Sequence, residues 1–239
     1  MKIYPVPFEK FVMRRSAIQW LLAAVTFSAV LSVSAQSLCG DLKNAVGPFD
    51  YRFEKKIAAG IELHHFNADV EALRRGQSTL LAGDIQYLLF AVPNHHRALA
   101  SLMRLGRKMK SEKLDGLGYP IECYFDRALR FQPNDAIARL LYADYLLAGK
   151  RTTEAGQQLE LAKGFAADNP FTQFNIGLMY LILQDYPRAL TQAHRAIELG
   201  FVKTDLKDRL VAAGQWVEPA LVPPALAPAA PAVSAASSP

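Results

Sequence analysis

Residues 136–200 read AIARLLYADYLLAGKRTTEAGQQLELAKGFAADNPFTQFNIGLMYLILQDYPRALTQAHRAIELG, and small residues recur in this stretch at a fixed offset. Each member of a first set precedes its counterpart by 34 positions (177−143, 189−155 and 196−162): Ala143, Ala155 and Ala162, then Gly177, Ala189 and Ala196. Ala128 extends the series backwards, because 162−128 is also 34. Self-similarity with a period of roughly 20–50 residues is typical of repeat architectures. The stretch therefore predicts stacked copies of one structural unit.

The composition of the 239-residue chain is that of an ordinary globular protein, with 51% hydrophobic and 21% charged residues. Once both ends are set aside, the remainder is large enough to bury one modest core. We expect four segments: a signal peptide at 1–35, an arm with short helices at 36–93, a repeat domain at 94–215 and a disordered tail at 216–239. The tail is predicted from its richness in Ala, Pro, Val and Ser.

The N-terminal residues have the pattern of an export signal. Four basic residues stand at the start, and residues 17–33 form an uncharged, mostly apolar run. Val33, Ser34 and Ala35 then offer small side chains to a signal peptidase, which predicts cleavage after Ala35. The alternative is that residues 17–33 are retained as an anchor in the inner membrane, although the run is short for a bilayer span. We therefore expect an exported, periplasmic protein.

The charge of the chain gives little support for nucleic-acid binding. Residues 1–35 hold four basic residues and one acidic residue, so they carry +3 of the net charge of +5 and leave about +2 (5−3) after cleavage. The one dense basic run, at 107–110, lies close to Glu112 and Asp115. A solvated helix end explains such a run better than a nucleic-acid interface. We expect no nucleic-acid partner.

Two cysteines, Cys39 and Cys123, follow the predicted cleavage site. An even number of cysteines in an exported chain predicts a disulfide, and two allow one intramolecular pairing. Buried free thiols are the alternative. A redox-active pair is not indicated, since no Cys-x-x-Cys spacing is present.

Apolar periodicity and capping signals predict an all-helical chain after an irregular arm at 36–61. Asn67 is expected to cap a short helix at 68–75, Asp84 a second at 85–91, and Asn94 a longer helix at 95–108. Further helices are expected at 120–131, 135–148, 153–165, 170–183, 186–199 and 203–213. The last of these would cover the exposed apolar side of the final helix pair.

The 34-residue unit resembles the tetratricopeptide repeat, a helix pair of that length. Small residues are needed in that family where helices cross, and this sequence matches those places at Ala128, Ala143, Ala155, Ala162, Gly177, Ala189 and Ala196. Tyr180 and Tyr186 match large aromatic positions of the repeat. The sequence departs from the family where no tryptophan opens either clear unit and where Ala167 replaces the usual closing proline.

The resemblance covers residues 94–203. It implies a right-handed stack of about three helix pairs with a C-terminal capping helix, in which the first pair is degenerate. In that pair the loop is enlarged, and Ile121 stands where a small residue is expected (155−34). Residues 47–52, 94–99 and 122–129 also resemble a group of uncharacterised secreted bacterial proteins that contain such repeats.

Tetratricopeptide arrays bind extended peptides in a groove lined by the first helix of each pair. The resemblance places the groove residues at Ile137, Leu140, Asp144, Leu147, Phe171, Phe174, Leu178, Leu181 and Ile182. The alternative is that residues 36–61 or the short N-terminal helices fill this groove. The basic residues with which some members clamp a terminal carboxylate are missing, because Leu140 stands where that clamp has a lysine.

The histidine pairs His64/His65 and His95/His96 are the only groups that resemble metal ligands. Adjacent histidines on a helix point about 100° apart, so each pair supplies one good ligand at most. A site would also need a carboxylate such as Glu62 or Asp69. No H-x-x-x-H or Cys/His spacing is present, so we predict no metal or other cofactor.

The sequence therefore favours a scaffold that binds a protein or peptide partner during assembly or maintenance of the cell envelope. We expect no enzyme, because no catalytic motif converges on a site. The membrane would be a partner only if the signal segment is retained. The rival hypothesis is a periplasmic protein that binds a metal or cofactor through the two histidine pairs.

Overall fold

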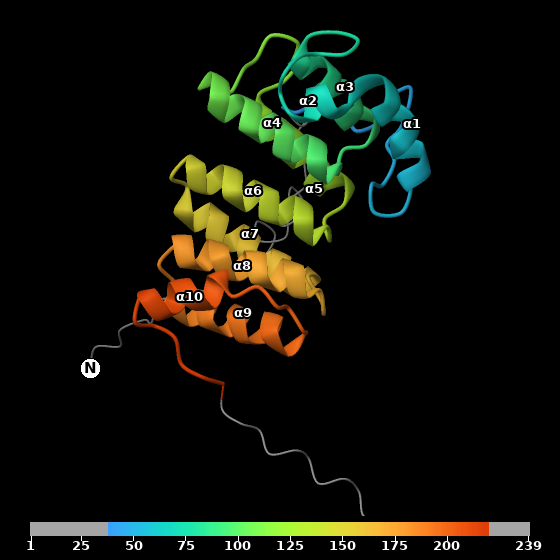
Figure 1. Ribbon diagram of the computed structural model, residues 1–239. Coiled ribbons are helices and arrows are strands. Elements are labelled where there is room, and N and C mark those ends of the chain that lie inside the picture. Colours follow the sequence, from blue (N-terminus) through green and yellow to red (C-terminus); the bar gives the residue numbers. More distant parts are fainter. Residues whose placement is uncertain (1–37, 220–239) are drawn as a thin grey trace, which may run out of the picture. The chain divides into compact units, whose positions relative to one another are not determined.

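In the computed structural model, the described part of the chain is residues 38–219, and its regular elements are ten helices (Figure 1). In chain order they are α1 (Lys55–His65), α2 (Ala68–Glu71), α3 (Leu81–Ala91), α4 (His96–Met109), α5 (Ile121–Phe131), α6 (Ala136–Ala148), α7 (Thr152–Phe165), α8 (Pro170–Ile182), α9 (Tyr186–Glu198) and α10 (Asp205–Ala212). The all-α fold class is confirmed for these residues. The expected signal peptide, the alternative anchor at 17–33 and residues 220–239 of the expected tail lie outside them.

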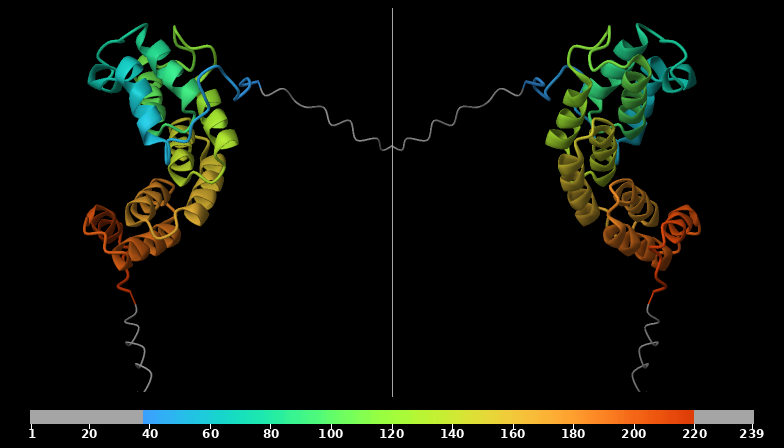
Figure 2. Two further views of the ribbon diagram at one scale, coloured as in Figure 1. Left: turned by 90° about the vertical axis from the view of Figure 1, so that its right-hand side faces the viewer. Right: turned by 90° about the vertical axis from the view of Figure 1, so that its left-hand side faces the viewer.

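Two helix pairs, α6 with α7 and α8 with α9, make up the C-terminal half of the described chain. α4 contacts α6 and α6 contacts α8, so these three helices form one row, which Figure 1 shows at the front. α7 packs against both α6 and α8, and α10 covers α8 and α9 at the end of the row. Figure 2 shows the row from its two sides, with α1 in blue towards one end and α10 in red at the other.

The small residues of the repeat lie where these helices touch. All are buried: Ala128, Ala143, Ala155, Ala162, Gly177, Ala189 and Ala196. At Gly177 of α8, an added Cβ would lie 3.1 Å from Cβ of Gln192 on α9 and 2.4 Å from Cδ2 of Leu206 on α10. The absence of a side chain at Gly177 therefore sets how closely α8 can approach both neighbours.

In the contact between α4 and α5, the large and the small residue have exchanged helices. Ile121 of α5, where the repeat predicts a small residue, is 1% exposed. Its partner is Gly106 of α4, where an added Cβ would lie 2.3 Å from Cδ1 of Ile121. The small residue of this contact thus stands on the first helix instead of the second.

Two buried apolar clusters meet in the middle of the described chain. One extends over α1–α5 with Ala138 of α6, and the other over α6–α10. Tyr142 and Tyr145 of α6 pack against both clusters, and the ring of Phe125 lies 5.4 Å and 5.2 Å from theirs. Aromatic contacts therefore join the N-terminal helices to the regular pairs.

The predicted disulfide between Cys39 and Cys123 is present, with an S–S distance of 2.06 Å. It fastens the arm that precedes α1 to helix α5. The same arm is hydrogen bonded to the end of α3, where Asn44 Nδ2 donates to the carbonyl of Phe90 at 2.7 Å and Phe49 N donates to Ala91 at 2.8 Å. The arm is therefore ordered by contacts with α3 and α5.

Helix α1 was not expected, because residues 36–61 show no clear periodicity. It begins at Lys55, and its N-cap Glu54 makes no side-chain capping bond. Gly60 in the middle of α1 is a weak helix former. The one buried residue within the helix is Ala58. Without a capping signal or an apolar stripe, the sequence gives no local indication of where this helix starts.

Two of the expected N-caps are wrong, and both side chains bond elsewhere. Asp84 lies inside α3, where its buried carboxylate accepts hydrogen bonds from the backbone N–H groups of Gln77, Ser78 and Thr79 in the preceding loop. Asn94 stands one residue before the N-cap of α4 and bonds across the molecule. The expected cap of Asn67 on α2 is confirmed.

Removal of the disulfide should destabilise the protein. In a Cys39→Ser variant the loop of sequence separation 84 is open in the unfolded chain, which then gains entropy. We expect the free energy of unfolding to fall by about 2–4 kcal/mol, measured by urea denaturation at neutral pH. Reductant should lower the midpoint of the parent protein and leave that of the variant unchanged; equal midpoints for all samples would contradict the prediction.

The close approach at Gly177 can be tested with a matched pair of substitutions. Gly177→Leu should cost about 1–3 kcal/mol, because the added side chain overlaps α9 and α10. Gly156→Leu on α7 is the control, since nothing lies within 4 Å of an added Cβ there. It should leave stability unchanged or raise it by up to about 1 kcal/mol through helix propensity. Thermal unfolding followed by circular dichroism separates the two, and equal losses would refute the assignment.

Candidate functional site

One side of the row of helices exposes a set of mostly apolar side chains. Helical spacing of i, i+4, i+7 and i+11 groups them on α6 and again, 34 positions later, on α8. We call this set the inner face: Ile137, Leu141, Asp144 and Ala148 of α6, with Phe171, Asn175, Leu178 and Ile182 of α8. Phe171 is 57% and Ile182 61% exposed, whereas Leu141 and Leu178 are half-buried.

The predicted groove residues divide between this face and the core. Ile137, Asp144 and Leu178 are half-buried members of the inner face, and Leu147 and Leu181 beside it are also half-buried. Leu140 and Phe174 are only 8% and 7% exposed and pack in the cluster of α6–α10.

Phe174 is covered by Phe201, a residue from the C-terminal part of the chain. The ring of Phe201, in the segment between α9 and α10, lies 4.5 Å from that of Phe174 and 6.2 Å from that of Phe171. The arm lies elsewhere: besides its bonds to α3 and α5, Arg52 donates to Gln132 and Asn134 in the turn before α6. Phe201 therefore covers Phe174 and lies close to Phe171 of the inner face.

The charge of the row changes from one helix to the next. No charged residue occurs between Pro170 and Ile182, the whole of α8. On the inner face of α6 the one charged residue is Asp144, whose carboxylate lies 3.0 Å from the guanidinium of Arg107 on α4. The exposed residues of α4 are by contrast strongly basic, since its sequence HRALASLMRLGRKM holds no acidic residue.

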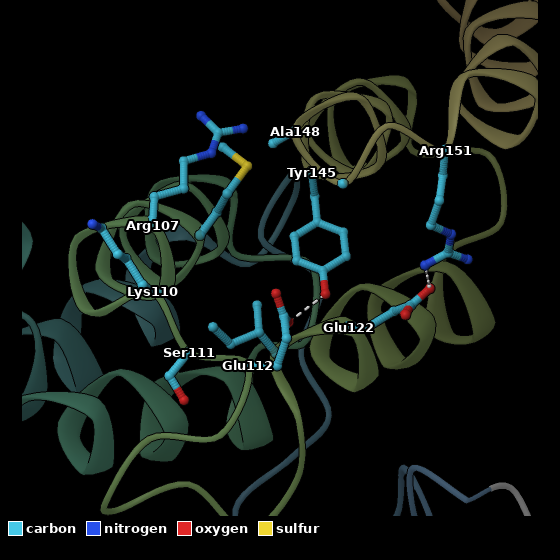
Figure 3. Close-up of a pocket in the computed structure, with 12 residues that line it drawn as sticks. Arg107, Lys110, Ser111, Glu112, Glu122, Tyr145, Ala148 and Arg151 are labelled. Atoms are coloured by element: carbon cyan, nitrogen blue, oxygen red, sulfur yellow. Dashed lines mark hydrogen bonds and ion pairs between the residues drawn. The ribbon is translucent and has the colours of Figure 1, made fainter.

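A cavity of about 440 Å³ opens where the C-terminal ends of α4 and α6 meet the start of α5 (Figure 3). Its apolar lining includes Met103, Gly106, Ile121 and Ala148. The Tyr145 hydroxyl crosses it to donate to Glu112, and both burial and this bond raise the pKa of Tyr145. No residue that lines this cavity was predicted as a site. The enlarged loop of the first unit, which holds Glu112, is the sequence feature that could have indicated it.

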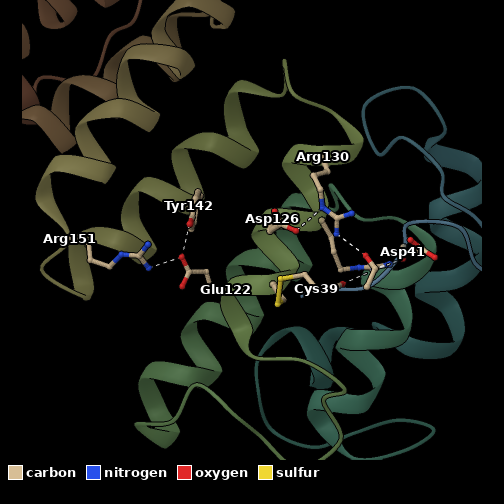
Figure 4. Close-up of a disulfide and its surroundings, with 10 residues drawn as sticks. Cys39, Asp41, Glu122, Asp126, Arg130, Tyr142 and Arg151 are labelled. Atoms are coloured by element: carbon tan, nitrogen blue, oxygen red, sulfur yellow. Dashed lines mark hydrogen bonds and ion pairs between the residues drawn. A yellow bond between two sulfur atoms is a disulfide. The ribbon is translucent and has the colours of Figure 1, made fainter. Parts of the chain in front are cut away.

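Beside the cavity, carboxylates and cations are already paired. Glu122 of α5 accepts hydrogen bonds from Tyr142 and Arg151, each at 2.6 Å (Figure 4). In the same view Arg130 lies 2.7 Å from Asp126, near the disulfide. Glu122 and Arg151 of the lining therefore neutralise one another, whereas Arg107 and Lys110 add positive charge at the α4 end of the cavity.

Three of the four histidines that resembled metal ligands are each held by a different carboxylate. His65 Nδ1 lies 3.0 Å from Asp84, His95 Nε2 lies 2.7 Å from Glu62, and His96 Nε2 lies 2.9 Å from Asp135. Asp69, the other candidate ligand, is paired with Arg74 and Arg75. In the described part of the chain, no group of three or more His, Cys, Asp or Glu is arranged to hold a metal ion.

His95 fixes the start of α4. Its Nδ1 accepts the backbone N–H of Ala98 at 3.1 Å, so the proton of the neutral ring is on Nε2, which donates to Glu62. The ring is fully buried and packs 4.0 Å from that of Tyr51. Burial lowers its pKa from 6.5 to about 4 despite the neighbouring Glu62 carboxylate.

A buried polar cluster lies next to this histidine. Asn94 Nδ2 donates to Asp50 and to Asp135, each at 2.8 Å, and its Oδ1 accepts the N–H of Tyr51. Asp50 also accepts hydrogen bonds from Arg52. Burial alone would raise the pKa of Asp50, but the bonds from Arg52 and Asn94 outweigh it and lower the pKa to about 2. The cluster joins the arm, the turn before α4 and the start of α6.

The sequence matches no protein-family model and no curated protein. No helix among residues 38–219 has both the length and the apolar character needed to cross a membrane.

Acid should weaken the fold through His95. The unfolded chain binds a proton at this histidine below pH 6.5, whereas the folded chain does so only near pH 4. Stability is therefore lost as the pH falls through this window, by at most about 3.5 kcal/mol at about 1.4 kcal/mol per pKa unit. Urea unfolding at a series of pH values from 7 to about 4 measures this slope.

His95→Asn is the matched control, because asparagine also caps a helix N-terminus and does not titrate in this range. The variant should be less stable at neutral pH, since it loses the bond to Glu62 and the packing on Tyr51. Its stability should, however, change less between pH 6.5 and 4. A slope equal to that of the parent would show that other groups cause the acid sensitivity.

Proposed function

We propose that this protein is an exported scaffold of the tetratricopeptide type that binds a protein partner through its inner face. The observation that carries the proposal is the exposure of Phe171 and Ile182 on a helix without charged residues. Exposed apolar patches on soluble proteins usually mark interaction sites. The partner most compatible with a row of helices is an extended peptide or a helix of another protein.

The proposed right-handed tetratricopeptide stack is supported by the period and by the contacts. The pairs α6–α7 and α8–α9 begin 34 positions apart (170−136), and small residues stand at their crossings. α10 covers the last pair, as a capping helix of a repeat array does. α4 and α5 would form the degenerate first unit.

An oxidising compartment is supported by the disulfide. Cys39 and Cys123 are bridged, and disulfides persist mainly in exported proteins. Together with the export pattern of residues 1–35, this favours the periplasm, and work in envelope assembly or maintenance. The rival proposal, a metal or cofactor held by the histidine pairs, is weaker because His65, His95 and His96 each bond to a separate carboxylate.

Photo-crosslinking in the native cell tests the proposal. A photoreactive amino acid at Ile182 or Phe171 should capture one defined partner, because both side chains reach solvent on the inner face. Leu161 of α7 is the control position: it is 44% exposed and apolar but lies outside the row of α4, α6 and α8. Adducts are identified by mass spectrometry.

A partner captured at Ile182 and not at Leu161 should also be lost when Phe171→Ser is added to the crosslinking variant. Capture that is equal at the two positions, or absent from both inner-face positions, would count against a binding role for this face.

A further inference from the structure

The second half of α4 places a group of cations next to the inner face. Arg104 and Lys108 are four residues apart and share one side of the helix, Arg107 is directed at α6, and Lys110 follows at the helix end. Arg107 lies 3.0 Å from Asp144, which is itself part of the inner face. We call these four residues the basic end of the row.

The basic end has few carboxylates of its own. Arg104 donates to the carbonyl of Glu71 and to Ser101, and Lys108 donates to the carbonyl of Leu73. These are neutral acceptors. In the described part of the chain, the Lys110 ammonium makes no hydrogen bond or ion pair with another residue, and Asp144 is the one carboxylate that pairs with any of the four. Glu112 lines the same cavity as Arg107 and Lys110, so the basic end keeps a local excess of about +2 (4−2). This is more than the partial charge of roughly −0.5 at a helix C-terminus balances.

The opposite end of the row, at α8, is uncharged and apolar. α8 has no charged residue and exposes Phe171 and Ile182, so a charged segment placed there would lose hydration without gaining a partner. The distance between the two ends is short. Neighbouring helix axes lie roughly 8–10 Å apart, so α4 and α8 are roughly 20 Å apart, which about six residues of extended chain span.

We propose that the partner segment is bipolar, with acidic residues over the basic end of α4 and apolar residues over α8. This inference rests on the proposed function and adds the chemical class of the partner and the direction in which it binds. A single peptide segment of about ten residues is long enough to cover both ends, at roughly 3.3 Å per residue. Acidic groups gain from the unpaired cations, and apolar side chains gain by covering Phe171 and Ile182.

Three fluorescein-labelled peptides test the proposal with the purified protein. Each has an apolar half of leucine and phenylalanine; the other half is glutamate in the first, glutamine in the second and lysine in the third. Fluorescence polarisation should give the lowest Kd for the glutamate peptide, roughly tenfold below that of the glutamine peptide, and this advantage should shrink as salt is added.

Two protein variants locate each half of the peptide. Lys108→Glu with Lys110→Glu should raise the Kd of the glutamate peptide roughly tenfold and leave the glutamine peptide unchanged. Lys43→Glu with Lys56→Glu, a matched charge change on the arm and α1, should have no effect beyond a small general loss. Ile182→Ser should weaken both peptides, because it removes apolar contact area. Circular dichroism checks that each variant is folded.

The outcomes separate this inference from the proposed function. Equal binding of all three peptides that depends on Ile182 would leave the scaffold role intact and overturn the bipolar partner. Binding of the glutamate peptide that ignores Ile182→Ser would show a general attraction for polyanions, nucleic acids included, and would also overturn it. The inference fails alone if no peptide binds while Ile182 captures a partner in cells; both fail if neither binding nor capture occurs.

Discussion

The close approach of helices at positions without large side chains determines how the rest of this molecule is arranged. At Gly177 the backbone of α8 comes so near to α9 and α10 that a Cβ would lie 3.1 Å from that of Gln192. Helices packed this closely leave room for a limited number of side chains between them. Leu140 and Phe174 are buried in the cluster of α6–α10, whereas Phe171 and Ile182 of α8 remain exposed.

Buried polar contacts fix the position of the N-terminal arm. Asn94 lies between Asp50 and Asp135 and donates to both, so it fixes the arm against the turn before α4 and the start of α6. In a buried network, removal of one member leaves the others without partners, which makes an alternative position of the arm costly. Acid sensitivity at His95 arises in the same region, since the ring packs on Tyr51 of the arm.

What could be predicted from the sequence depends on how local its cause is. The helices of residues 136–200 were expected within one residue of their ends, because periodicity, caps and the 34-residue offset all act within a single unit. Asn94 was expected to cap α4 because it stands directly before the helix. The expectation failed because its partners, Asp50 and Asp135, lie 44 and 41 positions away and leave no local signal. Phe174 was expected in the groove because nothing local indicates that Phe201 covers it. The family resemblance therefore predicts where a binding face would lie, and the contacts show which of its residues are exposed.

The contrast between α4 and α8 is not required by packing. Both helices belong to the same row and contact α6, and a charged residue at the exposed position 171 or 182 would reach solvent without disturbing the core. Exposed apolar side chains lower solubility, and a charged residue at position 171 or 182 would raise it at little cost in stability. The chain nevertheless leaves α8 without charge and gathers four cations on the second half of α4. Arg104, Arg107 and Lys108 also bond to neighbouring elements, so part of this charge serves the fold. The proposed bipolar partner would account for the rest, namely Lys110 beside a helix that exposes Phe171 and Ile182.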